Sequence, residues 1–338
     1  MGAAEPHENP SLQRDSDVPR SALRCPLPPE RLFQRPPRAE RCGESVPRED
    51  ADRDAMNARL LKGRPAAKEI LSQLAIRNRA RSRDGRRPPL LAVFTVGEDA
   101  AAEQYLRALR RVAGEIGVEV RVRRLGGETA FDAYRAAVLE EAGRSEVDGV
   151  QLLKPLPERR HVWEVMQGVT PEKDVEGVHP ENLGLLLLGR PRYIPCTAAA
   201  VMVLLERHGI DLSGRKAVVV GRSDTVGKPL ASLLLSRHAT VTICHSITAD
   251  LEAEVRRADV LVAALGRPEH IRGEWVRSGA TVVDLGHHVL PDGRTVGDVE
   301  VSARERAGAL TPVPGGAGPI TVAVLMSNLL EAAHRRRD

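Results

Sequence analysis

The residue pattern best suited to binding chemistry is a short polar loop between two apolar runs, at residues 217–235 (AVVVGRSDTVGKPLASLLL). Gly221 ends the first run. Pro229 fits the first turn of a following helix, where its missing N–H costs nothing. A helix N-terminus directs free N–H groups and a partial positive charge at such a loop. The segment therefore predicts a phosphate site, with a mere tight turn as the alternative.

The loop departs from the common phosphate motifs. Five residues separate its two glycines, Gly221 and Gly227, and no Ser or Thr follows Lys228, so it is not a Walker loop. Ser223 occupies the middle position of a GxGxxG pattern, so it is not that motif either. The prediction of a phosphate site depends on the strand–loop–helix order alone.

The next apolar run indicates which dinucleotide would bind. In NAD-binding units an acid about 20 residues further on holds the ribose 2′-OH. Here the run ATVTIC is followed by His245 and Ser246, and no acid appears before Asp250. Arg222 and Ser246 suit a 2′-phosphate instead, because a guanidinium binds phosphate oxygens in a planar fork. We therefore expect NADP rather than NAD.

Alternating helical and strand-like segments must position this loop. Apolar runs at 90–96, 118–125 and 147–157 alternate with helical patterns at 100–117 and 129–145, which predicts a βαβαβ unit with a parallel, doubly wound sheet. The runs 216–221, 239–244, 259–265 and 281–286 form a second α/β unit. Helical spacing also starts at Met56, and a long apolar helix ends the chain.

Composition excludes several classes of protein. The net charge of +4 and the 2% aromatic content lack the clustered basic face of a nucleic-acid binder. No apolar run reaches the ~18 residues of a membrane-spanning helix. The four cysteines form no CxxC pattern, which favours a reduced, cytoplasmic setting. Residues 1–55 are rich in Pro, Arg and acids, which predicts a disordered extension, or else translation starts at Met56.

Taken together, these motifs resemble the methylenetetrahydrofolate dehydrogenase/cyclohydrolase family, over roughly Met56 to the C-terminus. The markers are Tyr105 in its helix, PLP at 155–157, PEKDVEGVHPENLG at 171–184, PCT at 195–197, VVGRSDTVGKP at 219–229, TVTICHSIT at 240–248, GDV at 297–299 and TPVPGGAGPITVAVLMSN at 311–328. Their order and spacing together carry the resemblance.

The resemblance implies two doubly wound α/β domains. A folate-binding catalytic domain would span 56–195, a Rossmann-type NADP-binding domain 196–309, and the loop and helix at 310–338 would return to the first domain. Folate would bind in the cleft between the domains. The resemblance also implies one-carbon metabolism on tetrahydrofolate derivatives and a homodimer built through the nucleotide domain.

The resemblance assigns roles to particular residues. Tyr105 would stack on the aminobenzoate ring of folate, and Glu176 would take the place of the family's folate-binding aspartate. The other folate contacts would be Pro314, Gly315, Gly316 and Thr321. The NADP contacts would be Gly221, Arg222, Ser223, Ser246 and His287. Adjacent histidines on a strand point opposite ways, so His287 and its neighbour His288 are not expected to bind a metal.

The chain departs from the family where the family has its catalytic lysine, one helical turn after the tyrosine. That position is Leu109, and Arg110 lies about 100° round the helix. The family's partner glutamine aligns with Leu153, and Lys154 follows it. Gln151 is expected on the same strand face, about 7 Å away. Lys154 is the candidate for a relocated base.

Chemistry indicates what these departures affect. Hydride loss from the folate methylene carbon leaves a cation stabilised by two nitrogens, so positioning supplies most of the catalysis. Hydrolysis of that cation moves protons and calls for an acid or base, which leucine cannot be. We therefore expect an NADP-dependent dehydrogenase with weak or absent cyclohydrolase. The alternatives are a bifunctional enzyme that uses Lys154, or a silent folate- and NADP-binding paralogue.

Overall fold

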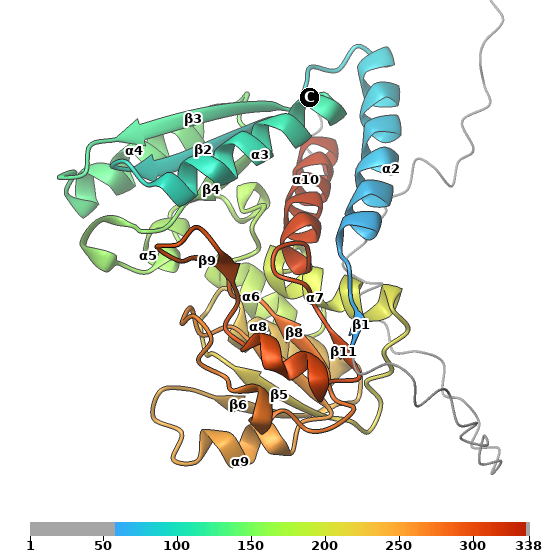
Figure 1. The fold of residues 1–338 in the computed structure, drawn as a ribbon. Coiled ribbons are helices and arrows are strands. Elements are labelled where there is room, and N and C mark those ends of the chain that lie inside the picture. Colours follow the sequence, from blue (N-terminus) through green and yellow to red (C-terminus); the bar gives the residue numbers. More distant parts are fainter. Residues whose placement is uncertain (1–57, 336–338) are drawn as a thin grey trace, which may run out of the picture.

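Two parallel sheets organise residues 58–335, the part of the chain that the computed structural model describes (Figure 1). Each sheet carries its own helices, which confirms the predicted two-domain α/β fold. The predictions for residues 1–55 and for Met56 as a start lie outside the described residues.

The sheet of the first domain has the strand order β3-β2-β4, all parallel. Its elements are β2 (Leu90–Val96), α3 (Ala100–Ile116), β3 (Glu119–Leu125), α4 (Phe131–Gly143) and β4 (Gly149–Leu152). The central strand β2 is apolar and buried along almost its whole length, as in a strand covered on both faces. The order of elements is the βαβαβ unit that the sequence predicts.

Helix α3 has clear sequence signals at both ends. Asp99 caps its start by accepting a 2.8 Å hydrogen bond from the backbone N–H of Ala102. Gly117 ends it in the left-handed conformation, with φ at 74°. The apolar face of α3 packs into the core and includes Leu109, which is completely buried. Tyr105 lies one turn earlier on this face, at its edge, and is only partly buried.

Short elements connect the two sheets. They are the 3₁₀ turns Pro157–Arg159 and Pro171–Lys173 and the helices α5 (Val162–Met166), α6 (Pro180–Leu187) and α7 (Cys196–Arg207). The segment between the second 3₁₀ turn and α6 crosses the cleft side of the first domain, where the candidate site lies.

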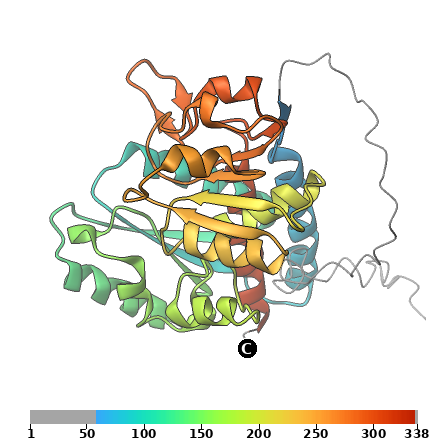
Figure 2. The same ribbon diagram turned by 90° about the horizontal axis from the view of Figure 1, so that it is seen from below.

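The larger sheet has six parallel strands in the order β1-β11-β8-β7-β5-β6. In chain order its elements are β1 (Arg59–Leu60), β5 (Lys216–Val220), α8 (Gly227–Ser236), β6 (Thr240–Cys244), α9 (Leu251–Arg256), β7 (Val260–Ala263), β8 (Thr281–Asp284) and β11 (Ala309–Leu310). Figure 2 shows these strands from below, with helices on both sides of the sheet.

Smaller elements complete this domain. An antiparallel hairpin joins β9 (His288–Val289) to β10 (Thr295–Val296), and two 3₁₀ helices span Gly273–Trp275 and Val301–Glu305. The hairpin follows β8 directly and so extends the chain from the end of β8 that faces the cleft (Figure 1).

Two long helices tie the domains together. Helix α10 (Ala317–Arg335) packs against α7, α2 (Arg64–Arg83), α3 and β4, so the C-terminal helix does return to the first domain. Figure 1 shows α10 and α2 side by side. The helix predicted from Met56 begins only at Arg64, and that part of the prediction is wrong. Leu61 N–H donates to Leu310 O at 2.9 Å, because pairing of β1 with β11 outweighs local helical spacing.

Candidate active site

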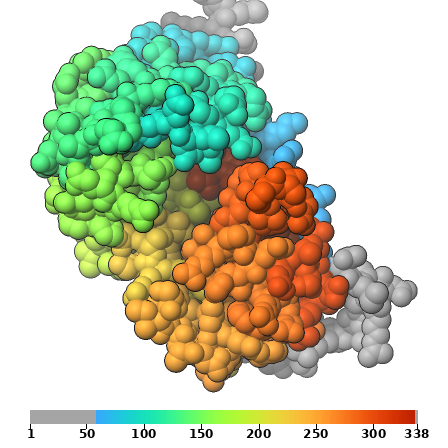
Figure 3. Space-filling model, turned by 60° about the vertical axis from the view of Figure 1, so that its left-hand side comes forward, coloured from blue at the N-terminus to red at the C-terminus, as the bar shows by residue number. Residues whose placement is uncertain are grey.

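A cleft lies between the two domains, and Figure 3 shows it as a hollow with the dark red surface of α10 inside it. Two adjoining cavities occupy the cleft, one of about 1000 Å³ and one of about 280 Å³. Tyr105, Thr197 and Thr321 line both cavities. Because α3, α7 and α10 each supply one of these side chains, the packing of three helices fixes the place where the cavities meet.

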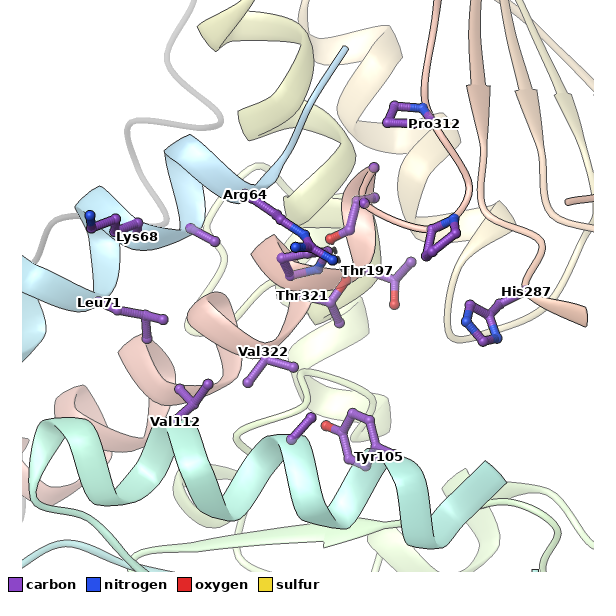
Figure 4. Close-up of a pocket in the computed structure, with 18 of the residues that line it drawn as sticks. Arg64, Lys68, Leu71, Tyr105, Val112, Thr197, His287, Pro312, Thr321 and Val322 are labelled. Carbon is purple, nitrogen blue, oxygen red and sulfur yellow. Dashed lines mark hydrogen bonds between the residues drawn. The ribbon is translucent and has the colours of Figure 1, made fainter. Parts of the chain in front are cut away.

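The larger cavity has walls from both domains (Figure 4). Helices α2, α3 and α10 form one side, and the turn after β8, which carries His287, forms the other. The predicted folate residues Tyr105, Pro314, Gly315, Gly316 and Thr321 all line it. The predicted NADP contact His287 is exposed and faces the same space.

Backbone packing holds the Pro/Gly loop in this wall. Gly63 N–H donates to Gly315 O at 2.9 Å, and a Cβ at Gly63 would lie only 2.0 Å from Gly316 O. Gly315 itself has φ at 117°, which L side chains rarely adopt. The loop is therefore pressed against the start of α2, and its backbone forms part of the cavity surface.

The smaller cavity is built around Glu176. Gly149 on β4 lets the chain before Glu176 approach closely, since a Cβ there would lie 2.6 Å from Val175 Cγ1. Gly177, with φ at 76°, then packs against the Ile194 carbonyl carbon. Cys196 N–H donates to Glu176 O at 3.2 Å. These contacts hold Glu176 between β4 and the start of α7.

A hydrogen-bonded chain joins three side chains in this cavity. Gln151 Nε2 donates to Tyr105 Oη at 2.8 Å and to Glu176 Oε1 at 3.2 Å. The other carboxyl oxygen of Glu176 accepts from Leu152 N–H at 3.1 Å. The structure thus brings the predicted residues Tyr105 and Glu176 together through Gln151.

Burial dominates the electrostatics of this cluster. It raises the pKa of the Glu176 carboxyl to about 7, although hydrogen bonds from Leu152 and Gln151 and the charge of Lys154 act in the opposite direction. Burial also raises the pKa values of the Tyr105 phenol and the Cys196 thiol, so both groups are neutral near pH 7. Glu176 is therefore the group here whose charge changes near neutral pH.

Leu109 and Leu153, the two residues that the resemblance aligns with a lysine and a glutamine, are both apolar. Leu109 is completely buried in the main core and lines neither cavity. Leu153 lines the smaller cavity and packs against the same core. Neither side chain can donate a proton or accept one.

Lys154 also lines the smaller cavity, but its charged end points toward the second domain. Its side chain is exposed, and Nζ lies 3.4 Å from Thr225 Oγ1 in the loop between β5 and α8. The amine thus lies at the mouth of the cavity, while Tyr105 and Glu176 bond to Gln151.

The loop at Gly221 has the close packing of a strand–loop–helix turn. Gly221 has φ at 135°, and a Cβ there would lie 2.3 Å from Ala264 O. A Cβ at Gly227 would lie 2.0 Å from Gly221 O. Ser223 Oγ accepts from Val226 N–H at 3.2 Å, just before α8. Only glycine at both positions lets the loop fold back on itself directly before α8.

The predicted 2′-phosphate contacts lie just past the ends of two neighbouring strands of the larger sheet. Arg222 follows β5 and Ser246 follows β6, and these strands are paired in parallel, with Val220 opposite Cys244. Both side chains are exposed. Asp250, the first acid after β6, caps α9 by accepting from Ala253 N–H at 2.9 Å. That carboxylate is engaged with its own helix, which suits the expectation of NADP.

A carboxylate network positions the turn that carries His287. Asp284 accepts from Gly286 N–H at 2.8 Å and from Asp298 N–H at 2.9 Å. Asp298 is completely buried and accepts from His288 Nε2 at 2.8 Å. These bonds fix the backbone on both sides of His287 and leave its ring free toward the cavity.

Sequence reasoning did not select Gln151, Thr197 or Arg64 as candidate site residues. Gln151 is a polar residue in an otherwise apolar buried strand, and that signal was available in the sequence. Thr197 and Arg64 each lie in the first helical turn after a proline- or glycine-containing segment, and nothing in the local sequence aims them at the cavity.

Residues 58–335 show neither a metal-binding cluster nor a membrane-spanning helix. No group of three His, Cys, Asp or Glu side chains there is arranged to hold a metal ion. None of the helices in that range has the length and apolar character to cross a membrane.

Comparison with family models matches both halves of the chain. Residues 61–176 match the catalytic domain of tetrahydrofolate dehydrogenase/cyclohydrolase, and residues 195–337 match the NAD(P)-binding domain of the same enzyme.

Individual proteins agree with the family models. The bifunctional protein FolD of Chloroflexus aurantiacus is 45% identical over 282 residues, which cover 83% of this chain and 99% of the relative. The bifunctional FolD of Campylobacter jejuni superposes with a TM-score of 0.77 at 34% identity, over 82% of this chain and 99% of its own. The Trypanosoma brucei enzyme, solved with NADP and an inhibitor, gives 0.77 at 35% identity, over 82% and 98%.

Replacing Glu176 with glutamine is expected to change how stability depends on pH. The folded carboxyl titrates near pH 7 and the unfolded one near 4.5, so the wild type loses stability as pH rises between these values. The glutamine variant lacks that loss. Relative to wild type, it should gain on the order of 2–3 kcal/mol between pH 4.5 and pH 8. Thermal unfolding at the two pH values measures this, and parallel pH curves for both proteins would contradict it.

Gly221→Ala is expected to weaken NADP binding at least tenfold, because the new Cβ collides with Ala264 O and displaces the loop. Gly214→Ala is the matched control, since Gly214 also has a positive φ, at 73°, but has open space around it. Isothermal titration with NADP measures both variants. Equal affinities for the two would show that the loop does not hold the cofactor.

Proposed function

The chain belongs to the tetrahydrofolate dehydrogenase/cyclohydrolase family, and from that membership we propose that it oxidises 5,10-methylenetetrahydrofolate to 5,10-methenyltetrahydrofolate with NADP, with a cyclohydrolase step that is weak or absent. The observation that carries this proposal is the pairing of an intact nucleotide loop with apolar side chains at positions 109 and 153.

The nucleotide domain supports NADP as the cofactor. The loop between Gly221 and Gly227 would bind the pyrophosphate at the start of α8, and Arg222 and Ser246 would contact the 2′-phosphate. His287 lies at the cavity wall where the nicotinamide end would reach. When bound, the nicotinamide ring accepts the hydride.

The two cavities suit the two parts of a folate. The smaller cavity, with Glu176 at its base, would hold the pterin ring, whose N–H groups need acceptors. The larger cavity would hold the aminobenzoyl-glutamate part, with its ring on Tyr105. The methylene carbon would then lie where the cavities meet, near Thr321 and facing the turn at His287.

Alignment is sufficient for the oxidation in such a site. Loss of hydride from a carbon between two nitrogens gives a cation that the nitrogen lone pairs stabilise, and no proton has to be removed. The residues therefore need only to hold the carbon in reach of the acceptor and to keep water out. Tyr105, Thr321 and the Pro/Gly loop do this by packing, which does not require a base.

Hydrolysis needs more than alignment. Water that attacks the cation must lose a proton, and a folate nitrogen must then gain one as the ring opens. Where the family has a lysine, this chain has Leu109, buried and pointing into the core. Loss of such acid–base assistance typically costs ~10²–10⁴-fold in rate. The alternative base, Lys154, is directed toward Thr225.

Leu109→Lys is expected to raise hydrolysis of 5,10-methenyltetrahydrofolate at least tenfold and to leave methylene oxidation within a few fold. Leucine at this position ends in the core, whereas the longer lysine side chain can extend from the buried face of α3 toward Tyr105, one helical turn away. Arg110→Lys is the control, since it adds a lysine on the neighbouring, exposed face of α3. Single-turnover absorbance assays on both folates measure the two steps separately.

Brisk hydrolysis by the unaltered protein would contradict the weak cyclohydrolase. In that case Lys154→Met decides between the remaining readings. If that variant loses hydrolysis and keeps oxidation, the chain is a bifunctional enzyme with Lys154 as its relocated base. Binding of NADP and folate with no turnover of either kind would instead identify a silent paralogue.

We also propose that the protein forms a homodimer through β6. This strand is the edge of the six-stranded sheet, so one row of its backbone groups is unpaired within the described domain. Apolar side chains surround it, with Ile243 38% exposed, Leu235 65% and Ile247 75%. Exposed apolar side chains beside an open edge favour association with a second copy.

Ile243→Lys is expected to shift the protein from dimer to monomer, because it places a charge in the apolar part of this edge. Val301→Lys is the matched control, since Val301 is 64% exposed on another element of the same domain. Size-exclusion chromatography with light scattering measures the mass of each. A monomeric wild type, or an unchanged mass for Ile243→Lys, would contradict the proposed interface.

A further inference from the structure

Gln151 occupies the centre of the smaller cavity's polar cluster. It is 95% buried, and its amide nitrogen bonds to both the Tyr105 hydroxyl and the Glu176 carboxyl. We propose that Gln151 is a positioning residue, whose amide holds the Tyr105 hydroxyl and the Glu176 carboxyl in one fixed arrangement. It does so from two residues before the position where the family has its glutamine. This inference rests on the proposed folate site.

The strand geometry explains how one residue can take over this role. Side chains two residues apart on a strand share a face. Leu153 directly follows the end of β4, and its N–H still donates to Phe94 O on β2 at 2.9 Å, so the extended backbone continues and Leu153 is expected on the same face as Gln151. Tyr105 Oη lies 2.8 Å from Gln151 Nε2, opposite Gln151 rather than opposite Leu153. Positions 109 and 153 carry leucine, which forms no side-chain hydrogen bond. Among the described residues, Gln151 is therefore the polar side chain that bonds to both Tyr105 and Glu176.

An amide suits this place because it can serve either charge state of Glu176. With Nε2 inward, it donates to an ionised carboxylate and to the phenol oxygen, as observed. Turned by 180°, it would place Oε1 inward, where it accepts from a protonated carboxyl and from the phenol O–H. The geometry of Tyr105 and Glu176 is the same in both cases.

The remaining amide atom supports such a turn. In the observed orientation Gln151 Oε1 is buried and has no hydrogen-bond partner among the described residues. Buried amide oxygens are nearly always bonded. The turned amide would bond its oxygen and leave both of its N–H groups on the outer side instead, so neither orientation satisfies every atom and neither is locked by the protein.

Several ionisable groups act on Glu176, and each has to be considered in a pH experiment. Those that face it are Tyr105 from α3, Tyr134 from α4, Lys154 after β4, Asp174 on its own segment and Cys196 at the start of α7. The amide of Gln151 is the neutral donor that favours the charged carboxylate, together with Leu152 N–H. Removing Gln151 should therefore raise the pKa of Glu176 further.

Gln151→Leu tests the proposal. We expect kcat/KM for 5,10-methylenetetrahydrofolate to fall about tenfold or more, because a hydrogen bond to a charged group and the orientation of Tyr105 are lost together. The acid limb of the pH profile of kcat/KM reports the ionisation of Glu176 in the free enzyme. We expect that limb to move up by about one pH unit in the variant. A loss of packing alone would lower the melting temperature without moving that limb.

Gln151→Glu gives a second, opposite signature in a side chain of the same size. A protonated glutamic acid still donates to Glu176, whereas two ionised carboxylates repel each other. Compared with the wild type at the same pH, the variant should therefore keep much of its activity at pH 6 and be about tenfold less active at pH 8. Gln104→Leu is the matched control, because Gln104 is exposed beside Tyr105 and should leave both the rate and the profile unchanged.

A binding measurement separates this inference from the proposed function. Isothermal titration with tetrahydrofolate at pH 6, 7 and 8 reports the same shift without any turnover. If the wild type binds tetrahydrofolate but oxidises nothing, the proposed function fails, and the pH dependence of binding still decides the role of Gln151. Absence of tetrahydrofolate binding by the wild type would overturn the inference, as would pH profiles that coincide for wild type and Gln151→Leu.

Discussion

The site depends on the burial of one carboxyl group, that of Glu176, between β4 and the start of α7. A buried carboxylate is costly unless hydrogen bonds compensate for lost water. Here the compensation comes from one backbone N–H and one side-chain amide. These two bonds fall short of offsetting burial, so the carboxyl titrates near neutral pH. Close packing at Gly149 and at Gly177 keeps the carboxyl in that environment.

The two domains contribute different things to the same cleft. The first domain supplies the polar cluster around Glu176 and the ring of Tyr105, and the second supplies a helix N-terminus and the turn at His287. Helix α10 belongs to both, since it lines the cavities and packs on α7, α2 and β4. A reaction that needs only alignment suits this arrangement, because rigid packing across domains is what fixes distances between two bound molecules.

Much of the fold follows from local patterns. Asp99 and Gly117 delimit α3 by capping, and the apolar runs of the second domain become neighbouring parallel strands. The same patterns mislead near the start of the described chain, where residues with helical spacing form β1. That strand exists because β11, some 250 residues later, offers it a backbone edge. No property of residues 59–60 alone could reveal such a partner.

The sequence by itself determined which groups are available to the site: a glycine-bounded loop before a helix, a tyrosine on α3, a glutamate after an aspartate, and leucine at positions 109 and 153. It also placed Gln151 and Leu153 on one strand face. Only the tertiary structure decided which of these groups meet. Gln151 touches Tyr105 and Glu176 because β4, α3 and the 171–178 segment pack together, and those contacts join residues 46 and 25 positions apart. Periodicity describes one element at a time, whereas hydrogen-bond partners across elements depend on how whole surfaces fit.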